Sequence, residues 1–134
     1  MFENYTVDLF DTPVQLREGG LVENAESRAR GPAGDDAGLW TMGAFHADDD
    51  HAVHSDVWER HPGGHEVLCV LSGAFRVHLR DHGDGTEPVA TLTAGRSFIV
   101  PAGRWHRLSV AEPGDLLSIT PRPGTEHERS EVRS

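Results

Sequence analysis

The apolar residues of this chain fall in short runs, and turn-forming residues separate almost every run from the next. The 134 residues include 15 glycines and 8 prolines, many of which stand between these runs. We find no apolar pattern that keeps a helical spacing beyond two turns. Because short strands joined by Gly and Pro turns build sandwiches and barrels, this pattern predicts an all-β domain. The length suits a single domain, since domains typically contain about 100–150 residues.

Eight of the runs are expected to form strands: residues 39–45, 57–61, 66–72, 74–80, 89–92, 97–100, 105–110 and 116–120. The run EVLCVLS at 66–72 is apolar almost throughout, which is typical of a strand buried on both faces. In the run at 74–80, apolar residues alternate with Arg76, His78 and Arg80. The alternation predicts a half-buried strand with these three residues on the solvent side.

The chain is expected to divide into three segments. Residues 1–38 would form an N-terminal arm and loop, residues 39–120 the barrel, and residues 121–134 a flexible tail. The arm contains short apolar pieces that can supply one or two strands, whereas residues 23–38 are polar and rich in Gly and Ala. The tail has almost nothing to bury, which favours fraying.

The charge balance excludes two classes of partner. There are 22 acidic and 12 basic residues, for a formal net charge of -10, and no basic stripe of the kind that binds nucleic acid. An acidic chain is repelled by anionic lipid, and no segment approaches the ~20 apolar residues that span a bilayer. Cys69 is the one cysteine, and the N-terminus lacks the pattern of a secretory signal. We therefore expect a cytoplasmic protein without disulfides.

Two clusters carry the candidate chemistry. In the first, Glu59 and His61 lie two apart on an expected strand, so their side chains share a face. A Pro-Gly-Gly turn follows, and Glu66 then opens the next expected strand. If the two strands were antiparallel neighbours about 5 Å apart, the Glu66 carboxylate would reach a cation bound by His61. The second cluster is Gly95-x5-Pro101-x-Gly103-x2-His106, in which a turn returns one imidazole to the barrel wall.

In this order, the clusters resemble the two motifs of the cupin superfamily, and the chain resembles its small single-domain metal-binding members. The family motifs read Gly-x5-His-x-His-x3,4-Glu-x6-Gly and Gly-x5-Pro-x-Gly-x2-His-x3-Asn. Here His61-x4-Glu66-x6-Gly73 matches the end of the first motif, and the second is nearly complete. Glu59 stands where the first histidine belongs, Val110 where the Asn belongs, and the leading Gly is not evident. The resemblance covers about residues 39–120.

The resemblance implies a cupin-type β-barrel, a double-stranded β-helix or jelly roll. It also implies one divalent metal bound by His61, Glu66 and His106, with Glu59 in the place of a fourth ligand. Two imidazoles and one carboxylate are the ligand set of non-haem Fe(II) sites, and a second carboxylate would suit Mn or Fe. Zn, Ni and Co stay open as alternatives, because affinity order alone does not select the metal in cells.

Each of these residues also has an ordinary interpretation. The histidines could serve packing, and Glu59 could pair with Arg60 or face solvent. His65 points away from Glu66 on an extended strand, so it is expected to be exposed or to support a ligand, yet it is the substitute if Glu59 does not bind. The histidines of the acidic loop HADDDHAVH are expected to be solvated, although a weak metal site is conceivable there.

The expected function is that of a metal-dependent enzyme acting on a small organic molecule. An Fe(II)-type oxygenase comes first, and a metal-assisted cyclase or isomerase second. The alternatives are a non-catalytic ligand-binding or sensory module and a metal-free structural barrel. A homodimer is expected in each case, because N-terminal strands that add to a partner's sheet would cover exposed edges.

Overall fold

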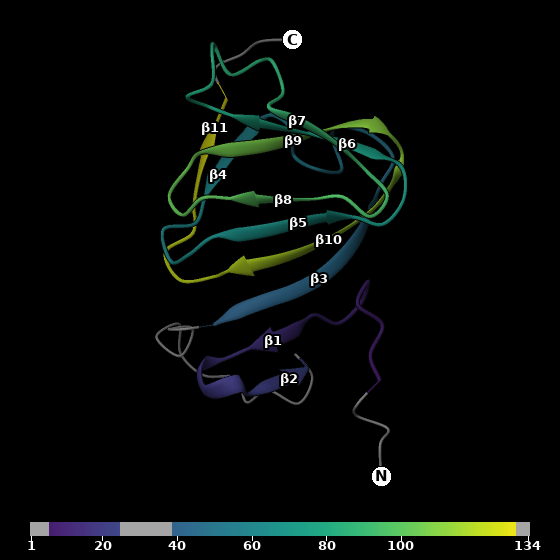
Figure 1. The fold of residues 1–134 in the computed structure, drawn as a ribbon, viewed down its shortest axis with the longest axis vertical. Helices are drawn as coiled ribbons and strands as arrows, with labels where there is room; N and C mark the ends of the chain where they lie inside the picture. The colour runs from purple at the N-terminus through teal and green to yellow at the C-terminus, as the bar shows by residue number, and fades with distance from the viewer. Residues whose placement is uncertain (1–5, 25–38, 131–134) are drawn as a thin grey trace.

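Two antiparallel sheets pack face to face as a jelly roll (Figure 1). The structure is a computed structural model that describes residues 6–24 and 39–130. The six-stranded sheet has the order β2 (Val22–Asn24), β1 (Val14–Leu16), β3 (Trp40–Ala47), β10 (Gly114–Pro121), β5 (Glu66–Val70) and β8 (Ser97–Val100). The five-stranded sheet has the order β11 (Glu126–Arg129), β4 (Val57–Arg60), β9 (His106–Glu112), β6 (Ala74–Leu79) and β7 (Ala90–Thr93).

The all-β prediction is confirmed, and each of the eight expected runs forms one strand, from β3 to β10. The helical structure of the described residues is one 3-10 turn, Glu18–Gly20. Nothing helical in residues 6–24 and 39–130 has the length and apolar character that crossing a membrane requires.

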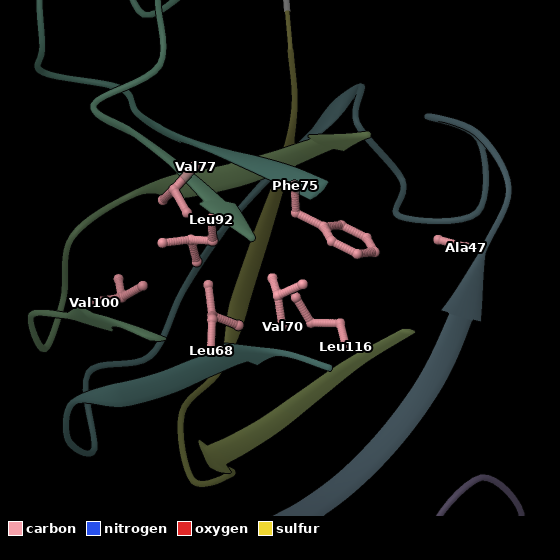
Figure 2. Packing of buried hydrophobic residues seen from close by; sticks show 8 residues of the cluster. All are labelled: Ala47, Leu68, Val70, Phe75, Val77, Leu92, Val100 and Leu116. Atoms are coloured by element: carbon pink, nitrogen blue, oxygen red, sulfur yellow. The ribbon is translucent and has the colours of Figure 1, made fainter. Parts of the chain in front are cut away.

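The hydrophobic core fills the space between the two sheets (Figure 2). Side chains from both sheets point toward one another there: Ala47, Leu68, Val70, Phe75, Val77, Leu92, Val100 and Leu116. On β5, burial alternates, with Leu68 and Val70 buried and Val67 and Cys69 half-buried. The prediction of a strand buried on both faces is therefore wrong, because nothing in the described residues fully covers the outer face of this sheet.

The prediction that His78 faces solvent is also wrong. Its ring is 4 % exposed and its Nε2 lies 2.8 Å from Ser109 Oγ on β9, although the alternating pattern predicted a solvent face. The loop between β6 and β7 folds back over this face, so that the backbone of Thr86 and Glu87 lies against the ring. The alternation of apolar and polar residues correctly predicted which face of the strand carries His78. It could not predict the loop that covers this face.

The prediction of a flexible tail is also wrong for residues 121–130, the part of the tail that the structure describes. Strand β10 runs through Pro121, and β11 pairs with β4 along the edge of the five-stranded sheet (Figure 1). All four residues of β11 are exposed, so the segment does bury little, but strand pairing orders it. At the other end, β1 and β2 extend the six-stranded sheet beyond β3. Strand β2 includes Glu23 and Asn24 of the polar loop expected at 23–38, whose other residues lie outside the described residues.

Candidate metal centre

Four side chains converge inside one end of the barrel. Glu59 belongs to β4, His61 follows that strand directly, Glu66 opens β5, and His106 opens β9. Each offers one ligand atom, and these atoms all lie within 4.8 Å of one another. Among the described residues, no other group of three or more His, Cys, Asp or Glu side chains comes together in this way.

Two sheets supply this cluster. Glu59 and His106 are directly opposite each other on the neighbouring strands β4 and β9. Glu66 reaches them from the six-stranded sheet, where β5 pairs with β8 and β10. The expected neighbour relation between Glu66 and the strand of His61 is therefore wrong. The carboxylate arrives across the barrel interior, although the residues that meet are those predicted.

Three of the four side chains are taken out of water. His61, Glu66 and His106 are 2 %, 4 % and 3 % exposed, whereas the Glu59 side chain is 33 % exposed. A buried ionised carboxylate needs a compensating charge or hydrogen bonds, since an unpaired one is very costly. Glu66 receives one bond, from the Thr120 hydroxyl to Oε2 at 2.6 Å.

Both imidazoles are oriented from behind, through Nδ1. The Thr125 hydroxyl donates its proton to the Arg122 carbonyl at 3.0 Å, because a carbonyl can only accept. The Thr125 oxygen therefore accepts a hydrogen bond from His61 Nδ1–H at 2.9 Å. His106 Nδ1–H donates to the Arg104 carbonyl at 3.2 Å. In the neutral ring, a proton on Nδ1 leaves a lone pair on Nε2. Both Nε2 lone pairs are thereby aimed into the cluster.

The atoms at the centre of the cluster suit a cation. His106 Nε2 lies 2.9 Å from Glu66 Oε1, yet that oxygen makes no hydrogen bond, and His61 Nε2 lies 3.5 Å from Oε2. Lone pairs this close repel one another unless a positive charge lies between them. Neutral imidazoles and carboxylates with converging lone pairs are the donors that divalent first-row metals use. The residues present therefore fit a bound metal.

When no metal is bound, a proton takes over part of this role. Burial alone would lower the pKa of His61, but hydrogen bonds with the Glu59 and Glu66 carboxylates outweigh it and raise the pKa to about 9. Burial alone would raise the pKa of Glu66, but the His106 and His61 rings lower it to about 2. Burial is likewise outweighed at Glu59, where His61 lowers the pKa. The cluster thus keeps its carboxylates ionised and attracts positive charge.

Glu59 uses its two oxygens differently. Oε1 lies 3.1 Å from His61 Nε2 and 3.9 Å from His106 Nε2, on the ligand side. Oε2 lies 2.6 Å from Nε2 of His127 on β11. Sequence reasoning missed His127 because it assigned the residue to a frayed tail. One local signal existed, since His127 alternates with two glutamates as in a strand.

The remaining histidines lie outside the cluster. His65 is exposed, and its Nδ1 accepts a hydrogen bond from the Ala102 N–H at 2.8 Å, which ties two turns together. His46 lies between Asp115 and Asp48, whose hydrogen bonds raise its pKa.

The cluster opens into a cavity of about 730 Å³ between the sheets. Glu59, Glu66 and His106 contribute to its wall. The rest of the wall combines apolar side chains with a few polar ones, including Phe45, Val53, Val57, Leu68, Leu108, Leu116, Ser118 and Thr120. A volume of this size is typical of small-molecule sites, about 300–1,000 Å³.

The two sheets of the antiparallel jelly roll bring His and Glu side chains together inside the barrel. This arrangement places the protein among β-barrel proteins with a candidate metal centre. Within that class the family is clear: the cupin domain matches residues 51–120, more than half of the chain, and the protein belongs to the cupins. No curated protein sequence matches the chain.

Several solved structures are similar to this chain at low sequence identity. A protein with a double-stranded β-helix domain from Klebsiella pneumoniae is 20% identical, with 69% of this chain and 71% of that chain covered and a TM-score of 0.50. A protein containing a cupin-2 domain from Shewanella frigidimarina is 24% identical, with 62% and 71% covered and a TM-score of 0.48. Fe(II) HppE in complex with its substrate is 21% identical, with 60% and 45% covered and a TM-score of 0.48.

Proposed function

We propose that the protein is a metal-dependent enzyme that acts on a small organic molecule. His61, Glu66 and His106 would hold one divalent metal, with Glu59 as a fourth ligand, and Fe or Mn would be favoured over Zn, Ni or Co. The observation that carries the proposal is the convergence of both Nε2 lone pairs on the Glu66 carboxylate, where Oε1 makes no hydrogen bond.

The residues of the cavity wall would have separate roles around such a metal. A metal held there would supply Lewis acidity or, as Fe(II), the capacity to activate O₂. Leu68, Leu108 and Leu116 line the adjoining cavity and would exclude bulk water from a bound organic molecule. Ser118 adds a hydroxyl to this apolar wall, and one or two such polar groups are what fix the orientation of a ligand.

An Fe(II)-type oxygenase is our first choice of reaction, because two imidazoles with a carboxylate suit Fe(II). The experiment loads the protein with Fe(II) and follows O₂ uptake with a metabolite extract added, beside His106→Ala as the matched variant. Uptake that needs both Fe(II) and His106 is the expected result. Product formed equally well under argon would contradict an oxygenase.

A metal-assisted cyclase or isomerase is the second candidate, and turnover under argon would support it. The pair formed by Glu59 and His127 favours it, since the 2.6 Å contact joins a carboxylate and an imidazole on the wall of the cavity. Such a pair can take a proton from a substrate and return it, which isomerisation requires.

A non-catalytic ligand-binding or sensory module is the alternative from another class. It predicts strong thermal stabilisation by metal, reversed by a chelator, with no turnover on any substrate panel. Turnover that depends on His106 would contradict it.

We also propose a cytoplasmic homodimer. The lone Cys69 suits a reducing compartment. The six-stranded sheet carries a row of apolar side chains across five of its strands, in direct register, on the face away from the core. The row consists of Val14, Met42, Ile119, Val67 and Ile99. Ile99 is 62 % exposed at the end of this row, and apolar patches of this kind mark contact surfaces.

A further inference from the structure

One short segment contacts three of the four candidate ligands. We name residues 120–129 the C-terminal brace. The Thr120 hydroxyl donates to Glu66, Thr125 accepts from His61, and His127 bonds Glu59. The brace thus lies behind the cluster, and all of it except Thr120 lies beyond the part of the chain that matches the cupin domain.

Strand pairing brings His127 to Glu59. In the register of β11 with β4, His127 is directly opposite Glu59, and opposed side chains on antiparallel strands lie close enough to interact. The His127 side chain is 58 % exposed, so its removal leaves no buried void. The contact with Glu59 is the interaction through which this residue reaches the cluster.

Surface ion pairs hold the brace on the barrel. Glu126 lies 2.6 Å from Arg60, and Glu128 lies 2.5 Å from Arg80. Arg129 lies 2.6 Å from Asp56, whose carbonyl also accepts from the Ser130 N–H. Exposed pairs each contribute little stability, typically less than about 1 kcal/mol. These pairs therefore orient β11 on the barrel without being a main support of the fold.

The His127 contact limits how Glu59 can turn. The last torsion of a glutamate side chain has a broad, two-fold profile, so a half-exposed carboxylate samples many orientations. A 2.6 Å bond at Oε2 restricts that rotation and leaves Oε1 facing His61 Nε2 at 3.1 Å. Partners of this kind typically change metal affinity 10–100-fold when they are removed.

We infer that the C-terminal brace is part of the metal centre and that His127 is a positioning residue, which fixes Glu59 with Oε1 turned toward the metal position. This inference rests on the proposed function, since it needs a metal to act on. It assigns a role to a residue outside both sequence motifs, and it makes Glu59 a ligand only while the brace is in place.

The test uses the full chain and Co²⁺ as the probe, with affinity from a competing chelator and coordination from the visible absorption of Co²⁺. His127→Ala should weaken Co²⁺ binding about 10-fold and change the absorption bands, because Glu59 is released. His127→Gln keeps an N–H donor and should restore most of both. His82→Ala removes another exposed histidine and is the matched control, with unchanged binding expected.

A double-mutant cycle shows whether His127 acts through Glu59. In the Glu59→Ala background, His127→Ala should have no further effect on Co²⁺ affinity. Equal binding by His127→Ala and the unsubstituted protein, or full additivity in the cycle, would overturn the inference alone. Failure of the unsubstituted protein to bind Co²⁺ would overturn the proposed function and the inference with it.

Discussion

The His78 ring is buried in the outer layer of the five-stranded sheet, with Arg107 and Arg76 close to it. Burial first, and then the Arg107 charge, lowers the pKa of His78 below its ordinary value of 6.5. At His78 the unfolded chain consequently takes up a proton at a higher pH than the folded one, as the pH falls below about 6.5. The contribution of His78 to the free energy of unfolding must drop in that range, whereas the raised pKa of His61 acts in the opposite direction.

The direction of this pKa shift gives a prediction for a single residue, His78. Between pH 7.5 and pH 5.5, with a chelator present, the free energy of unfolding of the native protein should fall relative to that of His78→Gln, which cannot take up the proton. Urea unfolding at the two pH values measures the difference. His82→Gln, which removes an exposed histidine, is the control and should keep the native pH dependence. A native pH dependence in His78→Gln would contradict the assignment.

At this scale, the sequence predicts the cluster but not its supports. His61, Glu66 and His106 are predictable because each has a fixed spacing from a Gly or Pro turn. Their hydrogen-bond partners are not, since Thr125 and His127 lie 64 and 68 residues from the side chains that they contact. Only the path of the chain after β10 brings such partners to the cluster.

At the element scale, two turns hold a glycine in the left-handed region of the backbone, and only one of the two turns is crowded. Gly73 follows β5 with a φ of +74°, and a Cβ there would lie 2.3 Å from the Pro113 carbonyl oxygen. Gly95 follows β7 with a φ of +84° and open space around it. The two positions share the left-handed backbone and differ in crowding.

Gly73→Ala should therefore destabilise far more than Gly95→Ala. The left-handed backbone costs a residue with a Cβ about 1–2 kcal/mol, which is the loss expected at Gly95. At Gly73 the clash with backbone adds to that cost, for a total of roughly 3 kcal/mol or more. Chemical denaturation of both variants measures the two losses. Equal losses of stability would contradict the prediction, because they would mean that the turn at Gly73 can rearrange to accept a Cβ.

Strand assignment also shows where local patterns stop being informative. Each apolar run produced a strand, but β4 and β5 joined different sheets although only a short turn connects them. Apolar periodicity shows which face of a strand is buried, not which strand becomes its neighbour. β11 has no apolar face at all, so no pattern of burial could reveal it.

On the scale of the whole molecule, the apolar row on the six-stranded sheet predicts self-association. Light scattering on the native protein should give twice the 14.6 kDa mass of one chain. Ile99→Asp places a charge at the exposed end of the row and should shift the mass toward the monomer. Thr91→Asp, at an exposed position on β7 of the other sheet, should leave the mass unchanged. A native monomer would contradict the proposed dimer.

The overall architecture was predictable because many short runs and turns leave few alternatives to a sandwich or barrel. The way in which the sheets supply the cluster was not, because Glu66 crosses the interior from the opposite sheet. The substrate class could not be predicted either, since the cavity wall combines residues from six strands and two loops.

Metal content is the most direct test of the central claim, that four side chains from both sheets hold one cation. Elemental analysis of protein purified without a metal-chelating column should find close to one divalent ion per chain. His61→Ala and His106→Ala, purified in the same way and still folded, should each lose it. One ion per chain retained in the His106→Ala protein would contradict the account.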